Sequence, residues 1–226
     1  MIQHHPKIVT NGLILHLDAA NKKSYSGTGS AWQDLSSVKN TATLNGSPQF
    51  NPLYGGYFTF NGTASQYAQV VNAAPYNFTT DLFTLECWAA ATSNAGYGRF
   101  FDHAYATGYA FMVDIEANGG RIVFEVNGNS PTRTIYDKGS TFKDGIWRQY
   151  VAVRTGSTTA SLYVNGINVV NGNIVGGTLT STNALQINSS SYPLGCNIAI
   201  SRVYNRALTA SEILKNYNAT KGRFGL

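Results

Sequence analysis

The two acidic residues whose spacing best suits catalysis are Asp114 and Glu116. Residues two apart in a β-strand point to the same face, and glycoside hydrolysis uses two carboxyl groups, one as proton donor and one as nucleophile or base. Both residues, however, lie in an alternating run of residues 109–116. Such alternation places polar side chains on the solvent side of a half-buried strand. We therefore interpret the pair as surface residues and predict no catalytic residues and no enzyme activity.

Histidine offers no second catalytic set. The four histidines are His4, His5, His16 and His103. Only His103 is expected in a loop suited to chemistry, beside Asp102, and two sequence neighbours do not form a catalytic triad without a positioned nucleophile. We expect His4 and His5 to be exposed in a terminal arm and His16 to be an ordinary strand residue.

Residues 102–109 carry the side-chain types of a sugar-binding site. Asp102 and His103 supply polar groups, and Tyr105 and Tyr109 supply aromatic rings. A tyrosine presents an apolar body and a polar tip, so it suits a sugar but also suits a half-exposed sheet face. We predict a carbohydrate site at Asp102, His103, Tyr105 and Tyr109, with simple coverage of a sheet as the alternative.

No cofactor or metal site is predicted. Calcium takes six to eight oxygen ligands, and Asp18 and Asp34 are the only candidates in the N-terminal segment. The two cysteines, Cys87 and Cys196, lack a histidine spacing that suits zinc. We expect both in apolar strands, either as small buried hydrophobes or as one disulfide.

The composition predicts a neutral polar surface. Charged residues make up 12% of the 226 residues, against about 25% in average domains. The net charge of +5 is dispersed, with Lys22-Lys23 as the only adjacent basic pair. Because nucleic-acid binding needs a basic patch or stripe, we predict no nucleic-acid partner. Neutral ligands such as sugars fit this surface better.

The chain shows no sequence signal for export or membrane insertion. The first residues, MIQHHP, lack the basic and apolar regions of a signal peptide. No run approaches the roughly 18 apolar residues of a membrane span. We therefore expect synthesis in the cytoplasm and no membrane partner.

Strand signals dominate the sequence. The expected strands, rich in β-branched and aromatic residues, are residues 8–18, 57–61, 67–71, 82–91, 109–116, 121–127, 147–153, 160–170, 185–187 and 197–204. Turn pairs such as Asn127-Gly128 separate them. This density predicts an all-β chain folded as a two-sheet antiparallel β-sandwich or jelly roll. Residues 22–52 are the least regular and are expected to wrap the edge of the sandwich.

One short C-terminal helix is predicted over residues 210–218. Thr209 and Glu212 have the spacing of a capping box, and Leu208 and Ile213 that of a hydrophobic staple. Gly222 is expected to end the helix. With no shift in composition along the chain, residues 11–220 form a single predicted domain, between an N-terminal arm at 1–10 and a tail at 221–226.

Seven short motifs in a fixed order identify a resemblance. They are GLILHLDAAN at 12–21, WQDLS at 32–36, ATLNG at 42–46, GYFTFNG at 56–62, FTLECW at 83–88, WRQYVAV at 147–153 with LYVNG at 162–166, and VYNRALTASEI at 203–213. Together they resemble the concanavalin A-like lectin/glucanase sandwiches of the laminin-G-like type. The resemblance implies a jelly roll, with sugar or calcium sites at the rim or on the concave face.

The same resemblance argues against two of the family's activities. Glucanase members carry an E-x-D-x-E strand, and in MVDIE at 112–116 the leading Glu position is Met112, so one carboxylate is absent. Many laminin-G-like sequences carry an acidic residue in the closing strand, where this chain has Ala199 or Ser201. The resemblance therefore implies neither glucanase chemistry nor a calcium site.

The two ends of the chain resemble a narrower group. PKIVTNGL at 6–13 and NATKGRFG at 218–225 are similar to structural proteins of tailed bacteriophages. This resemblance implies a non-enzymatic virion protein, a capsid decoration or a tail or fibre component, made in the host cytoplasm. Its expected partners are other capsid or tail proteins and further copies of itself in a homo-oligomer. The alternative hypothesis is a carbohydrate-binding adhesion module for host or environmental glycans, and a glycan hydrolase is the least favoured.

Overall fold

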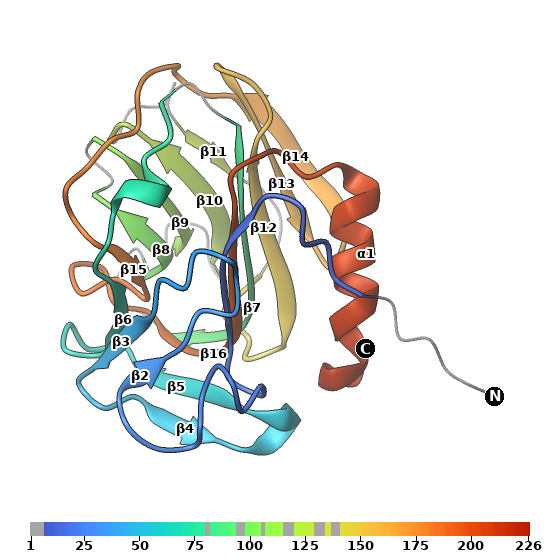
Figure 1. Cartoon of the computed structure of the whole chain (residues 1–226). Helices are drawn as coiled ribbons and strands as arrows, with labels where there is room; N and C mark the ends of the chain where they lie inside the picture. The colour runs from blue at the N-terminus through green and yellow to red at the C-terminus, as the bar shows by residue number, and fades with distance from the viewer. Residues whose placement is uncertain are drawn as a thin grey trace.

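The fold is an all-β sandwich in which two antiparallel sheets pack against each other (Figure 1). The computed structural model describes residues 7–79, 82–93, 98–104, 107–114, 120–128, 134–136 and 141–226. One C-terminal helix, α1 (Ala210–Thr220), lies against the outside of one sheet. The predicted fold class, a two-sheet antiparallel sandwich with one short helix, is confirmed.

The sheet beneath α1 is here named sheet A. Its order is β14 (Ile167–Asn173), β13 (Thr159–Val164), β12 (Arg148–Arg154), β7 (Phe83–Ser93), β16 (Gly195–Tyr204), β5 (Tyr57–Asn61) and β4 (Gln49–Asn51). Strand β1 (Leu13–Asp18) also pairs with β16. The first and last long strands of the domain are therefore neighbours.

The opposite sheet is named sheet B. Its order is β11 (Thr134–Tyr136), β10 (Arg121–Val126), β9 (Tyr109–Asp114), β8 (Gly98–His103), β15 (Leu185–Ile187), β6 (Tyr67–Val70), β3 (Ala42–Asn45) and β2 (Ala31–Trp32). Short 3-10 turns at Leu53–Gly55, Ala74–Tyr76 and Lys221–Phe224 complete the elements.

Two strand predictions need correction. The expected strand at 160–170 is a hairpin, because Asn165 and Gly166 both adopt positive φ, 51° and 78°, and reverse the chain. The expected loop around His103 is strand β8, which pairs with β9 and β15. Residues 22–52 do lie at the sandwich edge, where they supply β2, β3 and β4.

The helix begins as predicted. Thr209 accepts a hydrogen bond from the Glu212 backbone N–H and Glu212 accepts one from Thr209, which completes the capping box. Leu208 and Ile213 are buried in one cluster, as a hydrophobic staple requires. The helix runs to Thr220, past the predicted end, because the chain continues into a 3-10 turn in which Gly222 has no capping role.

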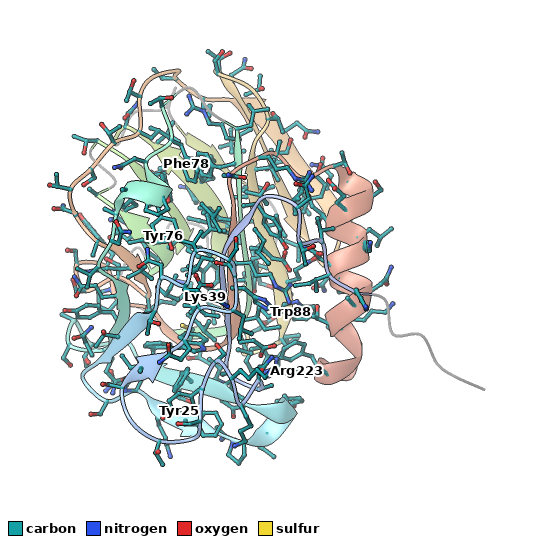
Figure 2. All side chains as sticks on the ribbon, in the orientation of Figure 1. Tyr25, Lys39, Tyr76, Phe78, Trp88 and Arg223 are labelled. Carbon is teal, nitrogen blue, oxygen red and sulfur yellow. The ribbon has the colours of Figure 1, made fainter. Side chains whose placement is uncertain are left out.

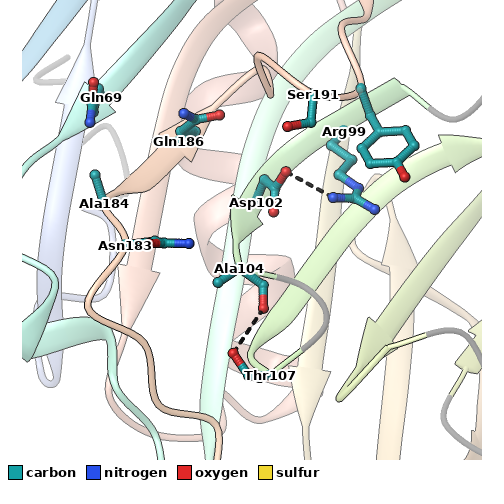
Figure 3. Close-up of a pocket in the computed structure, with 10 residues that line it drawn as sticks. Gln69, Arg99, Asp102, Ala104, Thr107, Asn183, Ala184, Gln186 and Ser191 are labelled. Atoms are coloured by element: carbon teal, nitrogen blue, oxygen red, sulfur yellow. Dashed lines mark hydrogen bonds and ion pairs between the residues drawn. The ribbon is translucent and has the colours of Figure 1, made fainter.

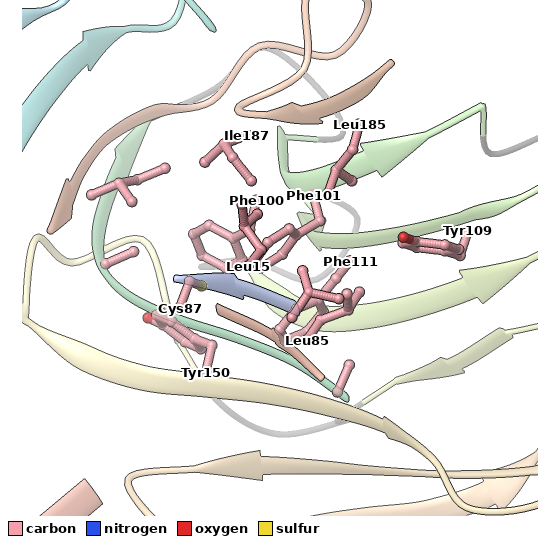
Figure 4. Packing of buried hydrophobic residues seen from close by; sticks show 14 of the residues in the cluster. Leu15, Leu85, Cys87, Phe100, Phe101, Tyr109, Phe111, Tyr150, Leu185 and Ile187 are labelled. Atoms are coloured by element: carbon pink, nitrogen blue, oxygen red, sulfur yellow. The ribbon is translucent and has the colours of Figure 1, made fainter. Parts of the chain in front are cut away.

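The core fills the space between the sheets with aromatic and aliphatic side chains. Figure 4 shows Phe100 of β8 beside Tyr150 of β12, with ring centres 4.9 Å apart. Cys87 and Cys196 are both buried and unbridged, and burial raises the pKa of each thiol. They act as small buried hydrophobes.

Both described ends of the chain are packed against sheet A. The backbone N–H of Val9 donates to Asn216 in α1 at 2.8 Å, and Phe224 stacks on Trp88 with ring centres 4.3 Å apart. Figure 2 shows Trp88 and Arg223 on this side, near the end of α1. Residues 8–10 and 221–224 are therefore parts of the packed domain, whereas the sequence suggested a separate arm and tail.

A buried ion pair joins the two central strands of sheet A under α1. Glu86 of β7 and Arg202 of β16 are direct partners in the register, and their side chains meet at 2.6 Å with 1% of each exposed. Gln149 donates to Glu86 at 3.0 Å and Asn216 donates at 2.7 Å. The carboxylate thus gathers donors from two further elements, β12 and α1.

Removing one partner of this pair is expected to destabilise the fold strongly. Glu86→Gln leaves the Arg202 charge buried without its counter-ion, which costs about 3–5 kcal/mol in comparable buried pairs. Urea unfolding with linear extrapolation measures the change in the free energy of unfolding. The matched control is Asp144→Asn, whose pair with Arg148 is partly exposed and should contribute less than about 1 kcal/mol. Equal losses of stability for the two substitutions would contradict the role of the Glu86–Arg202 pair in holding the fold.

His16 should make stability depend on pH. Burial, together with the charge of Arg202, lowers the pKa of His16 from 6.5 to about 3. Between these values the unfolded chain binds a proton that the folded chain does not, so the free energy of unfolding falls as pH decreases from 6.5 towards 3. The slope is at most about 1.4 kcal/mol per pH unit. Urea midpoints of His16→Gln should fall less over this range, and parallel curves for the two proteins would refute the prediction.

Candidate functional site

A row of polar side chains crosses the outer face of sheet B. The strand register pairs Thr43 with Gln69, Gln69 with Gln186, and Gln186 with Asp102. Directly paired residues of neighbouring strands point to the same face. Their neighbours on β6 and β15 are all buried in the core: Ala68, Val70, Leu185 and Ile187. The polar row therefore faces away from the core, on the side of the molecule opposite α1.

A cavity of about 650 Å³ lies over part of this row, as Figure 3 shows. Its lining combines one ion pair, three amides, hydroxyls and a tyrosine ring: Gln69, Arg99, Asp102, Ala104, Thr107, Asn183, Ala184, Gln186, Ser191 and Tyr192. The volume falls in the range of about 300–1,000 Å³ that small-molecule sites occupy.

Asp102 is held in one orientation at the floor of the cavity. Its Oδ2 accepts hydrogen bonds from Arg99 Nη1 at 2.8 Å and from Ser189 Oγ at 2.5 Å. The Arg99 guanidinium lies 3.8 Å from the centre of the Tyr192 ring, a cation–π contact. In the described part of the chain no donor reaches Asp102 Oδ1. The ion pair thus leaves one carboxylate oxygen available to a ligand.

The loop at residues 188–194 builds one wall of the cavity. Asn188 adopts the left-handed conformation, with φ of 59°, which asparagine tolerates better than most residues. Its buried side chain accepts a hydrogen bond from the Leu194 N–H at 2.8 Å. Ser189 Oγ accepts from the Tyr192 N–H at 3.2 Å while it donates to Asp102. The loop and the carboxylate are therefore fixed by the same hydroxyl group.

The structure places the four predicted sugar-site residues differently from one another. Asp102 lines the cavity. His103 and Tyr109 are fully buried, because His103 alternates inward from Asp102 on β8 and Tyr109 packs on Phe83 at 4.9 Å between ring centres. Burial lowers the pKa of His103 and raises that of Tyr109. Their rings have no face open to a ligand, which corrects the prediction; Tyr105 lies outside the described residues.

Sequence reasoning missed most of the cavity lining. Gln69 and Gln186 interrupt apolar strands at alternate positions, so periodicity does indicate that both face outward. Arg99 and Tyr192 carry no such signal. They meet only because a loop that follows β15 returns to the start of β8, where the Arg99 N–H donates to the Tyr192 carbonyl at 3.1 Å.

The residues considered for calcium serve the protein's own loops. The Asp34 carboxylate accepts hydrogen bonds from the backbone N–H of His16, from the backbone N–H of Ser36 and from the Ser36 hydroxyl. Asp18 accepts from Arg223 at 2.7 Å. Among the described residues, no three His, Cys, Asp or Glu side chains converge on a possible metal position.

The segment that was considered for glycoside hydrolysis, residues 112–116, is described only in part. Strand β9 includes Met112 and Asp114, whereas Glu116 lies outside the described residues.

Arg154 and Arg202 are buried, so part of the positive charge is withdrawn from the surface. Within the described ranges, no helix combines the length and the apolar character needed to cross a bilayer.

The sequence matches the model of the concanavalin A-like lectin/glucanases superfamily over residues 60–214, more than half of the chain. The chain belongs to this superfamily. The match runs from the end of β5 through β16 and includes every described residue that lines the cavity. A comparison with curated proteins found no match.

The solved structures similar to this superfamily member include clostridial toxin binding domains. The binding domain of paraclostridial mosquitocidal protein 1 has a TM-score of 0.71 and 14% identity, over 92% of this chain and 52% of that one. The binding domain of botulinum neurotoxin DC in complex with SialylT has a TM-score of 0.70 and 15% identity, over 93% and 52%.

A third similar structure concerns botulinum neurotoxin type C. Cell entry of that toxin is dependent upon interaction with two ganglioside molecules, and the structure has a TM-score of 0.68 and 14% identity over 92% of this chain and 51% of that one. This chain therefore spans about half the length of the solved relatives. At such identities the likeness establishes the fold.

Proposed function

We propose that this protein is a glycan-binding module whose ligand occupies the cavity on sheet B. The observation that carries the proposal is the set of groups in that cavity: a fixed carboxylate at Asp102, three side-chain amides and the Tyr192 ring. Carboxylates and amides are the partners that sugar hydroxyls bind, and a tyrosine ring offers an apolar surface beside them. The sialyl and ganglioside ligands named for the toxin relatives support the same class of ligand.

Binding without hydrolysis is supported by the number of carboxylates. Asp102 is the only carboxylate among the described residues that line the cavity. Glu125 lies on the same cross-strand row as Asp102, because Ala110 pairs with both residues. Glu125 is, however, two strands away from Asp102, roughly 9.6 Å at about 4.8 Å per strand, and does not line the cavity. A glycosidase needs two carboxyl groups that flank the bond to be cleaved, about 5–5.5 Å apart in retaining enzymes and about 6.5–9.5 Å apart in inverting ones, and the described lining supplies only one. We therefore assign the cavity to recognition.

We further propose, from the resemblance of the two ends, that the module serves as a structural or host-recognition part of a tailed-phage virion. The described parts of those ends pack on sheet A, through Val9 and Phe224, so they support the domain itself. Mass spectrometry of purified phage particles tests this role. Many copies of the chain per particle are expected, and its absence from intact particles would overturn the virion role without touching glycan binding.

Two conservative truncations should weaken glycan binding. Gln69→Ala and Asn183→Ala remove cavity amides that make no hydrogen bond within the described residues, so the fold should be unaffected. Losing one net hydrogen bond of about 0.5–1.5 kcal/mol lowers affinity by roughly two- to tenfold. A glycan array identifies the sugars that bind, and calorimetry with the best-bound sugar gives the dissociation constants.

The matched controls are Gln49→Ala on β4 and Asn173→Ala on β14. Both side chains are exposed on sheet A and are far from the cavity in the fold. They should leave affinity unchanged. If wild type binds no sugar on the array, or if cavity and control variants weaken binding equally, the proposal is wrong.

A further inference from the structure

A second groove continues the cavity beside the ends of β9, β10 and β15 in sheet B. It has a volume of about 660 Å³ and is lined by side-chain amides and hydroxyls: Asn77, Thr107, Asn127, Thr178, Thr180, Ser181 and Thr182. Thr107, labelled in Figure 3, lines both spaces. The two spaces therefore adjoin at this threonine.

One chain segment forms a wall of both spaces. Residues 178–182 line the groove, and Asn183, Ala184 and Gln186 line the cavity. Thr178 and Thr180 are exposed on either side of Leu179, which is fully buried. The segment therefore presents hydroxyl groups to the groove at regular spacing while its apolar side chain enters the core.

Several contacts fix this wall before any ligand binds. Leu179 and Phe78 exchange two backbone hydrogen bonds, of 2.7 and 2.9 Å. Asn77 Oδ1 accepts from the Ser181 N–H at 2.7 Å, and the buried Arg154 donates to the Gly177 carbonyl at 3.1 Å. A preorganised wall loses little conformational entropy on binding.

The charges of the combined site select the chemistry of its ligand. None of the described residues that line the groove is charged. In the cavity, the two charged residues, Arg99 and Asp102, pair with each other. An anionic sugar would need a cation directed at it, whereas hydroxyl and amide groups both donate to and accept from sugar hydroxyls.

We propose that the cavity and the groove together bind an extended, uncharged oligosaccharide, with the groove holding the residues that follow the one bound at Asp102. This inference rests on the proposed glycan-binding function. A peptide is less suited to the groove, because every described residue that lines it is polar. The apolar residue of the wall segment 178–182, Leu179, is buried in the core and does not line the groove.

Affinity should therefore increase with the length of a neutral glycan. The probes are oligosaccharides derived from laminarin, cellulose and chitin, each from the monosaccharide to the hexasaccharide, with sialylated and sulfated sugars for comparison. Calorimetry on the full chain should give a dissociation constant that falls with length and then levels off. Thr180→Val and Thr182→Val remove groove hydroxyls without changing side-chain size, and Thr28→Val, an exposed threonine in the 22–52 segment, is the matched control.

Each groove substitution should weaken the longer oligosaccharides by roughly two- to tenfold and leave the shortest bound sugar unchanged, whereas Asn183→Ala should weaken all lengths. If length has no effect, or if the threonine variants bind long sugars as wild type does, the groove has no role and glycan binding in the cavity still stands. Tighter binding of a sialylated or sulfated sugar, or of a peptide, overturns the inference. Binding of no sugar overturns the proposed function as well.

Discussion

The buried carboxylate of Glu86 is the interaction on which the rest of the fold depends. A charge removed from water is tolerated only when it is paired and hydrogen-bonded, so Arg202, Gln149 and Asn216 must all reach it. These residues belong to β16, β12 and α1, which are distant from β7 in sequence. Asn216 in turn accepts from the Val9 N–H. One carboxylate thereby requires both ends of the chain to close over sheet A, and the sandwich has a covered face and an open face as a result.

This asymmetry determines where a ligand can bind. The outer face of sheet A is occupied by α1 and by the aromatic stack of Trp88 and Phe224. None of the described residues forms an α-helix on the outer face of sheet B, and the polar row there is aligned by the strand register. Because that row crosses β3, β6, β15 and β8, its side chains come from four parts of the sequence and are held at sheet spacing. Four of the ten residues that line the cavity, Gln69, Arg99, Asp102 and Gln186, lie on strands, and the other six lie on adjoining loops. The polar row itself is therefore held by strands, which position side chains more precisely than free loops do.

The elements that follow a simple period could be predicted from the sequence. Alternation identified β10 and β13, although the predicted strand at 160–170 ran on through the turn at Asn165. Capping chemistry identified the start of α1 at Thr209. Strand β8 was missed because Arg99, Phe100 and Phe101 break the alternation: the register shifts there, and both phenylalanines enter the core. That bulge decides that Asp102 faces outward and that His103 faces inward. The cavity also depends on pairing between β6 and β15, which are over 100 residues apart, and no local pattern encodes such pairing.

The groups in the cavity on sheet B are the reason that we propose recognition, and not hydrolysis, for this member of the lectin/glucanase superfamily. Fold alone does not fix function, so the chemical groups in the cavity decide which function we propose. Asp102 already accepts from Arg99 and Ser189 through one oxygen, which fixes the carboxylate as an acceptor with its other oxygen toward the ligand. No second carboxylate lines the described part of the cavity, and the adjoining groove adds only neutral groups. A surface that offers acceptors and donors without a reactive pair of acids can hold many sugar hydroxyls at once, which is why we propose an extended, uncharged oligosaccharide as its ligand.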